Sequence, residues 1–302
     1  MLKHTAKPYR TRQQRCHRSV TGSASWLMLP VLSSVAFAVS LVGTAPTSWA
    51  QDEPPKFSNL RALIEINATD GDAGFQVEID GDDWKQVTLR DPNSKRIYEV
   101  KGRRSVGDQG LTENFFESAE PSCDEVALDV VLSRFPEGLY EFAGRTTENE
   151  KFEGEAILTH ALPAVPVNLD FANDSSMRIS WEWPGDSPGL GNCPFTGHPG
   201  GAPQILQDEG DLFGFQVVVA REEPDPLVEF VVELAPTERD VVIPDNFIEP
   251  NKTYKWEVIA MGAAGEESED LVMELNNQER GNQTIAEGDF CTDSAGNAVD
   301  CD

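Results

Sequence analysis

The chain has 302 residues, with 24 Lys or Arg against 52 Asp or Glu, so its formal net charge at pH 7 is −28. This length predicts two domains, with one domain as the weaker alternative. So acidic a surface repels phosphate backbones and anionic lipid, which argues against nucleic acid as a partner and leaves cations, basic proteins or simple solubility open.

Residues 1–50 predict a secretory signal peptide. They carry six Lys or Arg and no acid, and residues 26–42 are apolar or small and uncharged. Ser48 and Ala50 supply the small side chains that a signal peptidase reads, so we expect cleavage after Ala50. This leaves 18 bases against 52 acids, a formal charge of −34. An uncleaved membrane anchor is the alternative, against which Pro30 and the shortness of the apolar run both count.

No second apolar run is long enough to cross a bilayer, so the sequence predicts a secreted or periplasmic protein without a membrane span after signal cleavage. Cleavage also removes Cys16. Four cysteines remain, namely Cys123, Cys193, Cys291 and Cys301. Cys291 and Cys301 bracket a short polar loop, which favours their pairing and leaves Cys123 to join Cys193 across the two halves of the chain. A metal site is the weaker alternative, because there is no Cys-x-x-Cys and only two histidines follow residue 50.

Residues 56–162 predict a β-sandwich domain with one short helix. Apolar and polar side chains alternate, or apolar ones cluster, in short segments at residues 60–66, 75–79, 87–89, 97–100, 139–142 and 155–158. Between them, Ser122 and Glu125 fit a capping box before an apolar stretch with helical spacing. Pro136 and Gly138 end that helix.

Acidic side chains gather in the turns of the first predicted hairpin. The five are Asp70, Asp72, Asp80, Asp82 and Asp83. Carboxylates in this setting can ligate calcium, although the spacing does not fit an EF-hand. With exposed aromatics such as Trp84 or Phe195, they suggest a calcium-structured carbohydrate-binding module. Ordinary turns are the alternative, because Asp and Gly suit tight turns for backbone reasons alone.

Residues 163–290 read as a second set of strands, expected at residues 165–171, 177–183, 213–219, 227–234, 241–244 and 254–260. In the last of these, Tyr254, Trp256, Val258 and Ala260 fall on one face, which predicts a half-buried strand, although Ile259 interrupts the polar face.

These segments resemble fibronectin type III domains. The residues that carry the resemblance are Pro163 and Pro166, Ile179-Ser180-Trp181, Gly214-Phe215-Gln216-Val217 and, most fully, residues 248–260. The resemblance implies an immunoglobulin-like sandwich of seven strands with Trp181 in its core. It also implies that Tyr254 is a corner tyrosine whose hydroxyl bonds to the backbone near residues 248–250.

Two stretches depart from the family pattern. Residues 184–214 form a long Gly- and Pro-rich connection that contains Cys193 and His198, and residues 263–280 precede the last strand, with one or two helical turns expected at 268–275. Long irregular segments in a compact domain are normally functional or disordered. Residues 291–302 are expected to be a tail closed into a loop by a disulfide.

No catalytic motif stands out. His160 and His198 lack a recognisable nucleophile partner, and there is no phosphate-binding loop or dinucleotide fingerprint. The sequence therefore predicts an all-β, non-enzymatic exported protein that acts as an adhesion or interaction module at the cell envelope or outside the cell. No cofactor other than calcium is implied, and the partner would be an unidentified protein or carbohydrate. A carboxylate-based hydrolase is the enzyme alternative, because 52 acids guarantee chance pairs.

Overall fold

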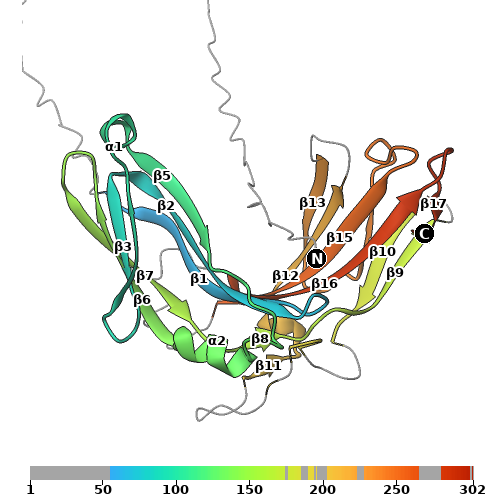
Figure 1. The fold of residues 1–302 in the computed structure, drawn as a ribbon, viewed down its shortest axis with the longest axis horizontal. Coiled ribbons are helices and arrows are strands. Elements are labelled where there is room, and N and C mark those ends of the chain that lie inside the picture. The colour runs from blue at the N-terminus through green and yellow to red at the C-terminus, as the bar shows by residue number, and fades with distance from the viewer. Residues whose placement is uncertain are drawn as a thin grey trace, which may run out of the picture. The chain divides into compact units, whose positions relative to one another are not determined.

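The structure is a computed structural model (Figure 1). It describes residues 55–173, 176–184, 190–193, 195, 203–222, 228–264, 280–299 and 301. The predicted signal peptide and the helical turns expected at 268–275 lie outside these residues. Within them, no helix is long and apolar enough to span a membrane.

Strands are the main regular structure of the described chain and helices are few, which confirms the all-β prediction. The largest sheet pairs, in order, β13 (Val228–Leu234), β12 (Leu212–Arg221), β15 (Thr253–Ala263), β16 (Arg280–Thr292), β1 (Phe57–Asn67), β2 (Asp72–Trp84) and β5 (Leu111–Glu117), and β17 (Ala298–Val299) also pairs with β16. A four-stranded sheet pairs β4 (Arg96–Lys101), β3 (Gln86–Arg90), β6 (Gly138–Arg145) and β7 (Lys151–Leu158). The smaller sheets are β14 (Asp240–Val242), β10 (Met177–Glu182) and β9 (Val167–Asn173), and the parallel pair β11 (Ile205–Leu206) and β8 (Leu162–Pro163).

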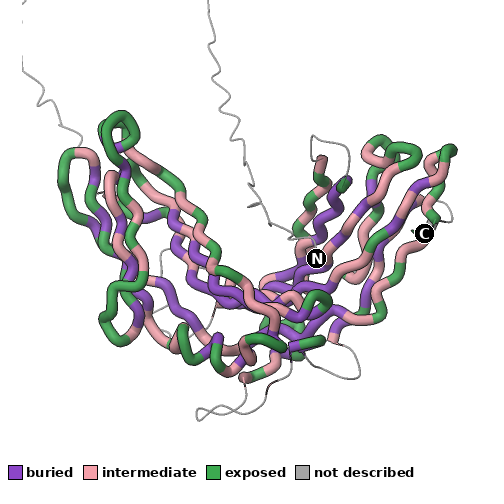
Figure 2. Tube along the Cα trace, in the orientation of Figure 1, coloured by how far each residue is buried: buried purple, intermediate pink, exposed green. Residues whose placement is uncertain are grey.

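Buried residues form two main cores, one in each half of the chain (Figure 2). The first core joins β1 and β2 to β3, β6 and β7, and its largest fully buried side chains include Trp84, Phe75 and Tyr140. Phe75 stacks on Phe135 with ring centroids 4.3 Å apart. The second core lies between the β9–β10–β14 sheet and β12, β15 and β16. The domain boundary at residues 162 and 163 stays a prediction, because one sheet runs through both halves.

The second half has the fibronectin type III-like arrangement, with three strands facing four around a common core. Trp181, Tyr254 and Trp256 are all buried there. The Tyr254 hydroxyl accepts a hydrogen bond from the Glu249 backbone N–H at 2.8 Å. This contact ties the turn before β15 to the strand itself, as in a tyrosine corner.

Ile259 has a structural reason for interrupting the polar face of β15. It lies on the face opposite Tyr254, where it joins Val218, Met261 and Ile285 in a small separate cluster of buried side chains. Successive side chains of a strand point to opposite faces. The large sheet therefore buries apolar side chains on both of its faces in this region.

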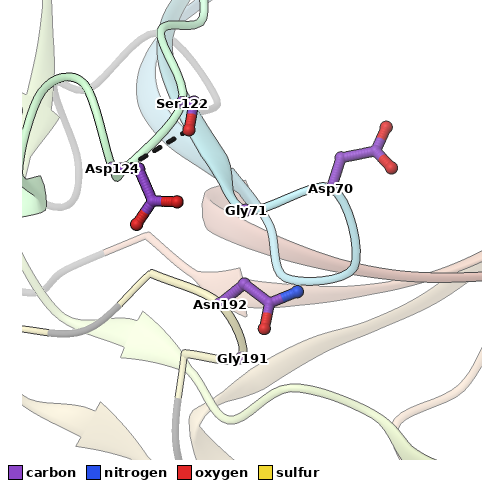
Figure 3. Close-up of a pocket in the computed structure, with 6 residues that line it drawn as sticks. All are labelled: Asp70, Gly71, Ser122, Asp124, Gly191 and Asn192. Atoms are coloured by element: carbon purple, nitrogen blue, oxygen red, sulfur yellow. Dashed lines mark hydrogen bonds between the residues drawn. The ribbon is translucent and has the colours of Figure 1, made fainter.

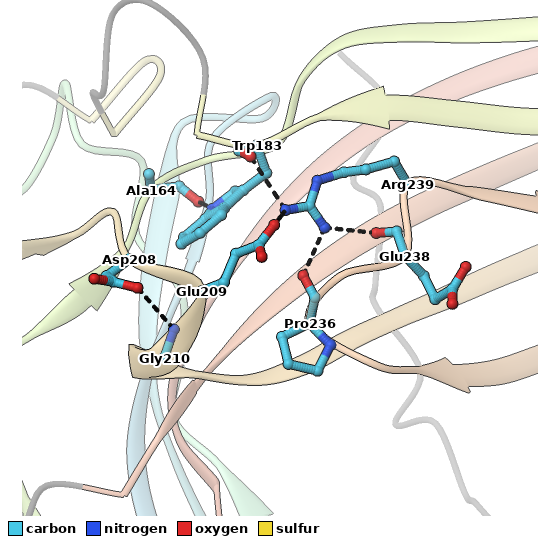
Figure 4. A network of polar contacts seen from close by, with 8 residues as sticks. All are labelled: Ala164, Trp183, Asp208, Glu209, Gly210, Pro236, Glu238 and Arg239. Carbon is cyan, nitrogen blue, oxygen red and sulfur yellow. Dashed lines mark hydrogen bonds and ion pairs between the residues drawn. The ribbon is translucent and has the colours of Figure 1, made fainter.

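Arg239 packs against the second core and bonds several acceptors around it (Figure 4). Its Nη1 donates to the Pro236 carbonyl at 2.6 Å and the Glu238 carbonyl at 2.7 Å, and its Nη2 to the Trp183 carbonyl and to Glu209. The guanidinium also lies 5.1 Å from the Phe215 ring centroid. A planar fork that stacks on an aromatic ring while bonding several acceptors is specific to arginine.

In the part of the chain that the structure describes, helices are few and short. They are α1 (Ser105–Gln109), α2 (Leu128–Arg134) and the 3₁₀ turn η1 (Glu209–Asp211). The capping box expected at Ser122 is wrong, because α2 begins only at Leu128 after Ala127, without a side-chain cap. Ser122 instead forms a bridge with Asp72. The Cys123 N–H bonds the Gly71 carbonyl at 2.7 Å, so the backbone here pairs with the β1–β2 hairpin, and a single turn, in which the Ser122 carbonyl accepts from the Val126 N–H at 2.9 Å, precedes α2.

Candidate functional site

The structure divides the five predicted acidic residues between the two ends of β2. Asp70 and Asp72 lie at the β1–β2 hairpin, and Asp80, Asp82 and Asp83 lie toward the far end of the strand. Asp80 lies eight positions after Asp72 along an extended strand, which corresponds to roughly 25 Å. The five carboxylates therefore do not form one group.

At the far end, two of these carboxylates hold the local turns. Asp82 Oδ2 accepts from the Lys56 backbone N–H at 3.0 Å, and Asp83 Oδ2 accepts from the Thr147 hydroxyl at 2.9 Å. The aromatic side chain expected to be exposed beside them, Trp84, is fully buried in the first core, so that expectation is wrong. Phe195 packs half-buried against the same core.

A polar pocket lies at the hairpin end (Figure 3). Its volume is about 420 Å³, and it is lined by Asp70, Gly71, Ser122, Asp124, Gly191 and Asn192. The volume suits a small ligand, but none of the described lining residues is aromatic. The pocket offers carboxylate, hydroxyl and amide oxygens, which suit polar ligands or a hard cation.

One side of this pocket is formed by Gly191 and Asn192, which belong to the long connection at residues 184–214. Asn192 donates its backbone N–H to the Ala68 carbonyl at 3.1 Å and its side-chain amide to the Thr69 carbonyl at 2.9 Å. Next to it, Cys193 forms a disulfide with Cys123, while Cys291 pairs with Cys301. These are the two pairs that the sequence favours. The described part of the insertion is thus attached to the first core.

Three carboxylates that sequence reasoning did not single out meet beside this pocket. Glu65 of β1, Glu117 of β5 and Glu120 each place a carboxylate oxygen within 4.8 Å of the others. Glu65 is directly opposite Gly74 on β2, and Glu120 lies over that glycine. A Cβ added to Gly74 would stand 2.7 Å from Glu120 Cγ. The glycine therefore makes the room in which Glu120 reaches Glu65.

The protonation of these carboxyls is unusual. Burial, followed by the charges of Glu65 and Glu117, raises the pKa of Glu120 to about 8. Burial is also the main cause that raises the pKa of Glu65 to about 7. Hard-cation ligands would be available here, but a proton competes for the same oxygens.

Further acids continue from this group along β2, β15 and β16. Burial, with Glu287 nearby, raises the pKa of Glu257 to about 7. Burial, with Asp70 and then Glu287, raises the pKa of Asp72 to about 6. The cation that faces them is Lys255, whose Nζ lies 2.6 Å from Glu287 Oε2.

No local pattern could have revealed the three-carboxylate group. Glu65 reads as an ordinary polar position of a strand, and Glu120 comes from a connection 55 residues later in the sequence. β5, which brings Glu117 and Glu120 to the hairpin, was not predicted as a strand, because its residues LTENFFE lack a clear alternation. As an edge strand, it has half-exposed or exposed residues along its length.

His160, the histidine within the described residues, makes hydrogen bonds that hold the local backbone in place. His160 Nε2 lies 2.8 Å from the Phe135 carbonyl oxygen, and its backbone N–H donates to Glu137 at 2.6 Å. It is thus bound to the segment that follows α2, with no serine or cysteine among these contacts. His198 lies outside the described residues.

No family model and no curated protein matches the chain. Among solved structures, it is similar to the three-domain FN1–FN3 segment of chicken CNTN1, at 11% identity, a TM-score of 0.29, and coverage of 80% of this chain and 68% of that one. A two-domain fibronectin type III segment of chicken tenascin is similar at 11% identity, a TM-score of 0.24, and coverage of 79% and 99%. Both are fibronectin type III structures, and likenesses this distant say nothing about function.

Proposed function

We propose that the chain is an exported, non-enzymatic binding or structural protein, acting as an adhesion or interaction module at the cell envelope or outside the cell. The observation that carries the proposal is the seam where the two halves share one sheet. There, residues 65–67 of β1 pair in parallel with residues 283–285 of β16 (Figure 1).

Side chains reinforce this seam. Asn282 accepts from the Ile64 N–H at 2.7 Å and donates to the Thr159 and Ala161 carbonyls at 2.7 and 2.8 Å. Asn67 donates its side-chain amide to Glu287 at 2.7 Å. β1 covers an edge of the fibronectin type III-like half that would otherwise present unpaired backbone groups. A shared sheet of this kind fixes the position of one half against the other, which suits a scaffold for binding surfaces.

Export is supported by the basic and apolar pattern of residues 1–50 and by the two disulfides, since disulfides persist in oxidising compartments. The test is expression of the full chain in a secreting host, followed by N-terminal sequencing and thiol titration of the released protein. We expect Gln51 as the first residue and no free thiol. Leu32→Arg should abolish release, whereas the control Leu32→Val should not. An intact chain with free thiols, retained in the cytosol, would contradict export.

A second candidate, a calcium-structured carbohydrate-binding module, is favoured by the polar pocket beside Asp70. Calorimetric titration of the protein from residue 51 with calcium and then with a glycan panel tests it. Chelator-sensitive glycan binding that is lost in Asp70→Asn with Asp124→Asn, and kept in the distant control Asp83→Asn, would support this candidate. Absence of binding would remove it, and glycan hydrolysis lost in Glu117→Gln would point instead to a carboxylate-based hydrolase.

A further inference from the structure

Residues 118–123 form a short segment laid along the β1–β2 hairpin, and we call it segment 118–123. Its first residue exchanges two hydrogen bonds with Phe75, since Ser118 N–H donates to the Phe75 carbonyl and Ser118 Oγ accepts from the Phe75 N–H, both at 2.9 Å. At its other end, Cys123 bonds the Gly71 carbonyl and the disulfide partner Cys193. Both ends are therefore anchored to the hairpin or to the insertion.

The middle of segment 118–123 is attached through Glu120. Its side chain crosses the bare backbone of Gly74 and reaches Glu65, which is only 9% exposed. A carboxyl oxygen of Glu120 lies within 4.8 Å of one of Glu65 and of one of Glu117. Two carboxylates this close in a buried setting cannot both carry charge cheaply, so one of them holds a proton, and that proton can form a hydrogen bond between the two carboxyl groups.

Among the described residues, no unpaired cation faces Glu65 and Glu120 to neutralise their charge. The titratable or charged groups that face the pair from the packed elements are Glu117 of β5, Asp72 of β2, Glu257 and Lys255 of β15, and Glu287 of β16. Lys255 is paired with Glu287. The other polar groups at Glu65 are neutral amides, namely that of Gln283, which donates to its Oε2, and that of Gln76. A proton is thus the counter-charge within this group.

We propose that Glu65 and Glu120 form a pH-sensitive latch, in which a shared proton holds segment 118–123 on the hairpin and loss of that proton releases its middle. The proton leaves to solvent, and both carboxylates then repel each other and the neighbouring acids. Because Ser122 belongs to the segment and lines the polar pocket, opening the latch changes one wall of that pocket. The disulfide at Cys123 limits the movement to the residues before it.

The direction of the pH effect follows from the raised pKa values of both carboxyls. Between the ordinary pKa of a glutamate and about 8, the folded protein holds protons that the unfolded chain has released. Stability therefore falls as pH rises across this window. The latch is closed at mildly acidic pH and open in mild alkali.

Hydrogen exchange of the protein from residue 51 tests the latch. After correction for the intrinsic pH dependence of exchange, we expect the Ser118 and Phe75 N–H groups, which bond the segment to β2, to lose at least tenfold protection between pH 6 and pH 9, whereas β6 keeps its protection. Glu120→Gln keeps a neutral hydrogen-bonding group and should hold the segment at both pH values. The matched control is Glu113→Gln on β5, an exposed glutamate, which should behave as wild type.

Urea unfolding provides the second readout. The folding equilibrium constant of wild type should fall by more than about tenfold from pH 5.5 to pH 8.5, and by clearly less in Glu120→Gln. Protection of the Ser118 and Phe75 N–H groups that does not change with pH in wild type would overturn the latch, even if the variant does not fold. An unchanged pH slope in folded Glu120→Gln would overturn it as well.

Discussion

At the scale of single residues, a few polar side chains in buried surroundings carry specific tasks. Tyr254 shows this most directly, because its ring is fully buried in the second core while its hydroxyl serves a backbone N–H. The sequence suggested this contact through the fibronectin type III resemblance. Glu65 and Glu120 could not be identified in this way, since their meeting depends on the glycine between them.

Replacing Tyr254 with Phe should lower the free energy of unfolding by about 1–2 kcal/mol, because the Glu249 N–H loses its partner while the ring packing stays. Urea denaturation of the protein from residue 51 measures this loss. The matched control is Tyr98→Phe, whose hydroxyl bonds Asn114 Oδ1 at 3.0 Å in a half-exposed position where water can take over. A larger loss in the control than in Tyr254→Phe would contradict the structural role of the corner.

At the scale of elements, local patterns identified strands with a strong alternation and failed where tertiary contacts decide. β1, β2, β12 and β15 were all expected near their observed positions. β5 was missed, because an edge strand needs no apolar alternation. The helix expected to begin at Ser122 starts later, because Ser122 and Cys123 pair with the hairpin. β5 and the Ser122–Cys123 pairing lie next to each other in the chain. Together they bring Glu117 and Glu120 to Glu65.

The two disulfides should differ in their contribution to stability. Cys123 and Cys193 are 70 residues apart and both buried, whereas Cys291 and Cys301 are 10 apart and Cys301 is exposed. Loop entropy alone predicts a loss of about 4 kcal/mol on opening the first and about 3 kcal/mol on opening the second.

Urea denaturation of the paired variants Cys123→Ala with Cys193→Ala, and Cys291→Ala with Cys301→Ala, measures the two losses. Each variant serves as the other's control for general effects of removing a disulfide. Equal losses, or a larger loss for the C-terminal pair, would show that the insertion adds little to the first core.

At the scale of the whole molecule, the shared sheet predicts that the two halves unfold together. Asn282 is the side chain to test, since it is 2% exposed and bonds three backbone groups across the seam. Asn282→Ala should cost about 3 kcal/mol, at roughly 1 kcal/mol for each bond lost.

Differential scanning calorimetry of the protein from residue 51 measures the coupling. Wild type should give one transition with equal calorimetric and van't Hoff enthalpies, and Asn282→Ala should lower that transition or split it in two. Asn297→Ala is the control, because Asn297 bonds Asp293 on the surface. Two independent transitions in wild type, unaffected by Asn282→Ala, would show that the halves are separate domains.

By itself, the sequence determined what depends on local pattern and composition: an acidic all-β chain, most of its strands, the favoured cysteine pairs and the tyrosine corner. These follow from period-two alternation, turn residues and a family pattern, all of which are written in neighbouring residues. The tertiary structure alone decided the β1–β16 seam, the burial of Trp84, the separation of the acidic turns and the meeting of Glu65 with Glu120. Each of these joins or separates residues through strand pairing and core packing, and no local pattern specifies which distant strands become neighbours.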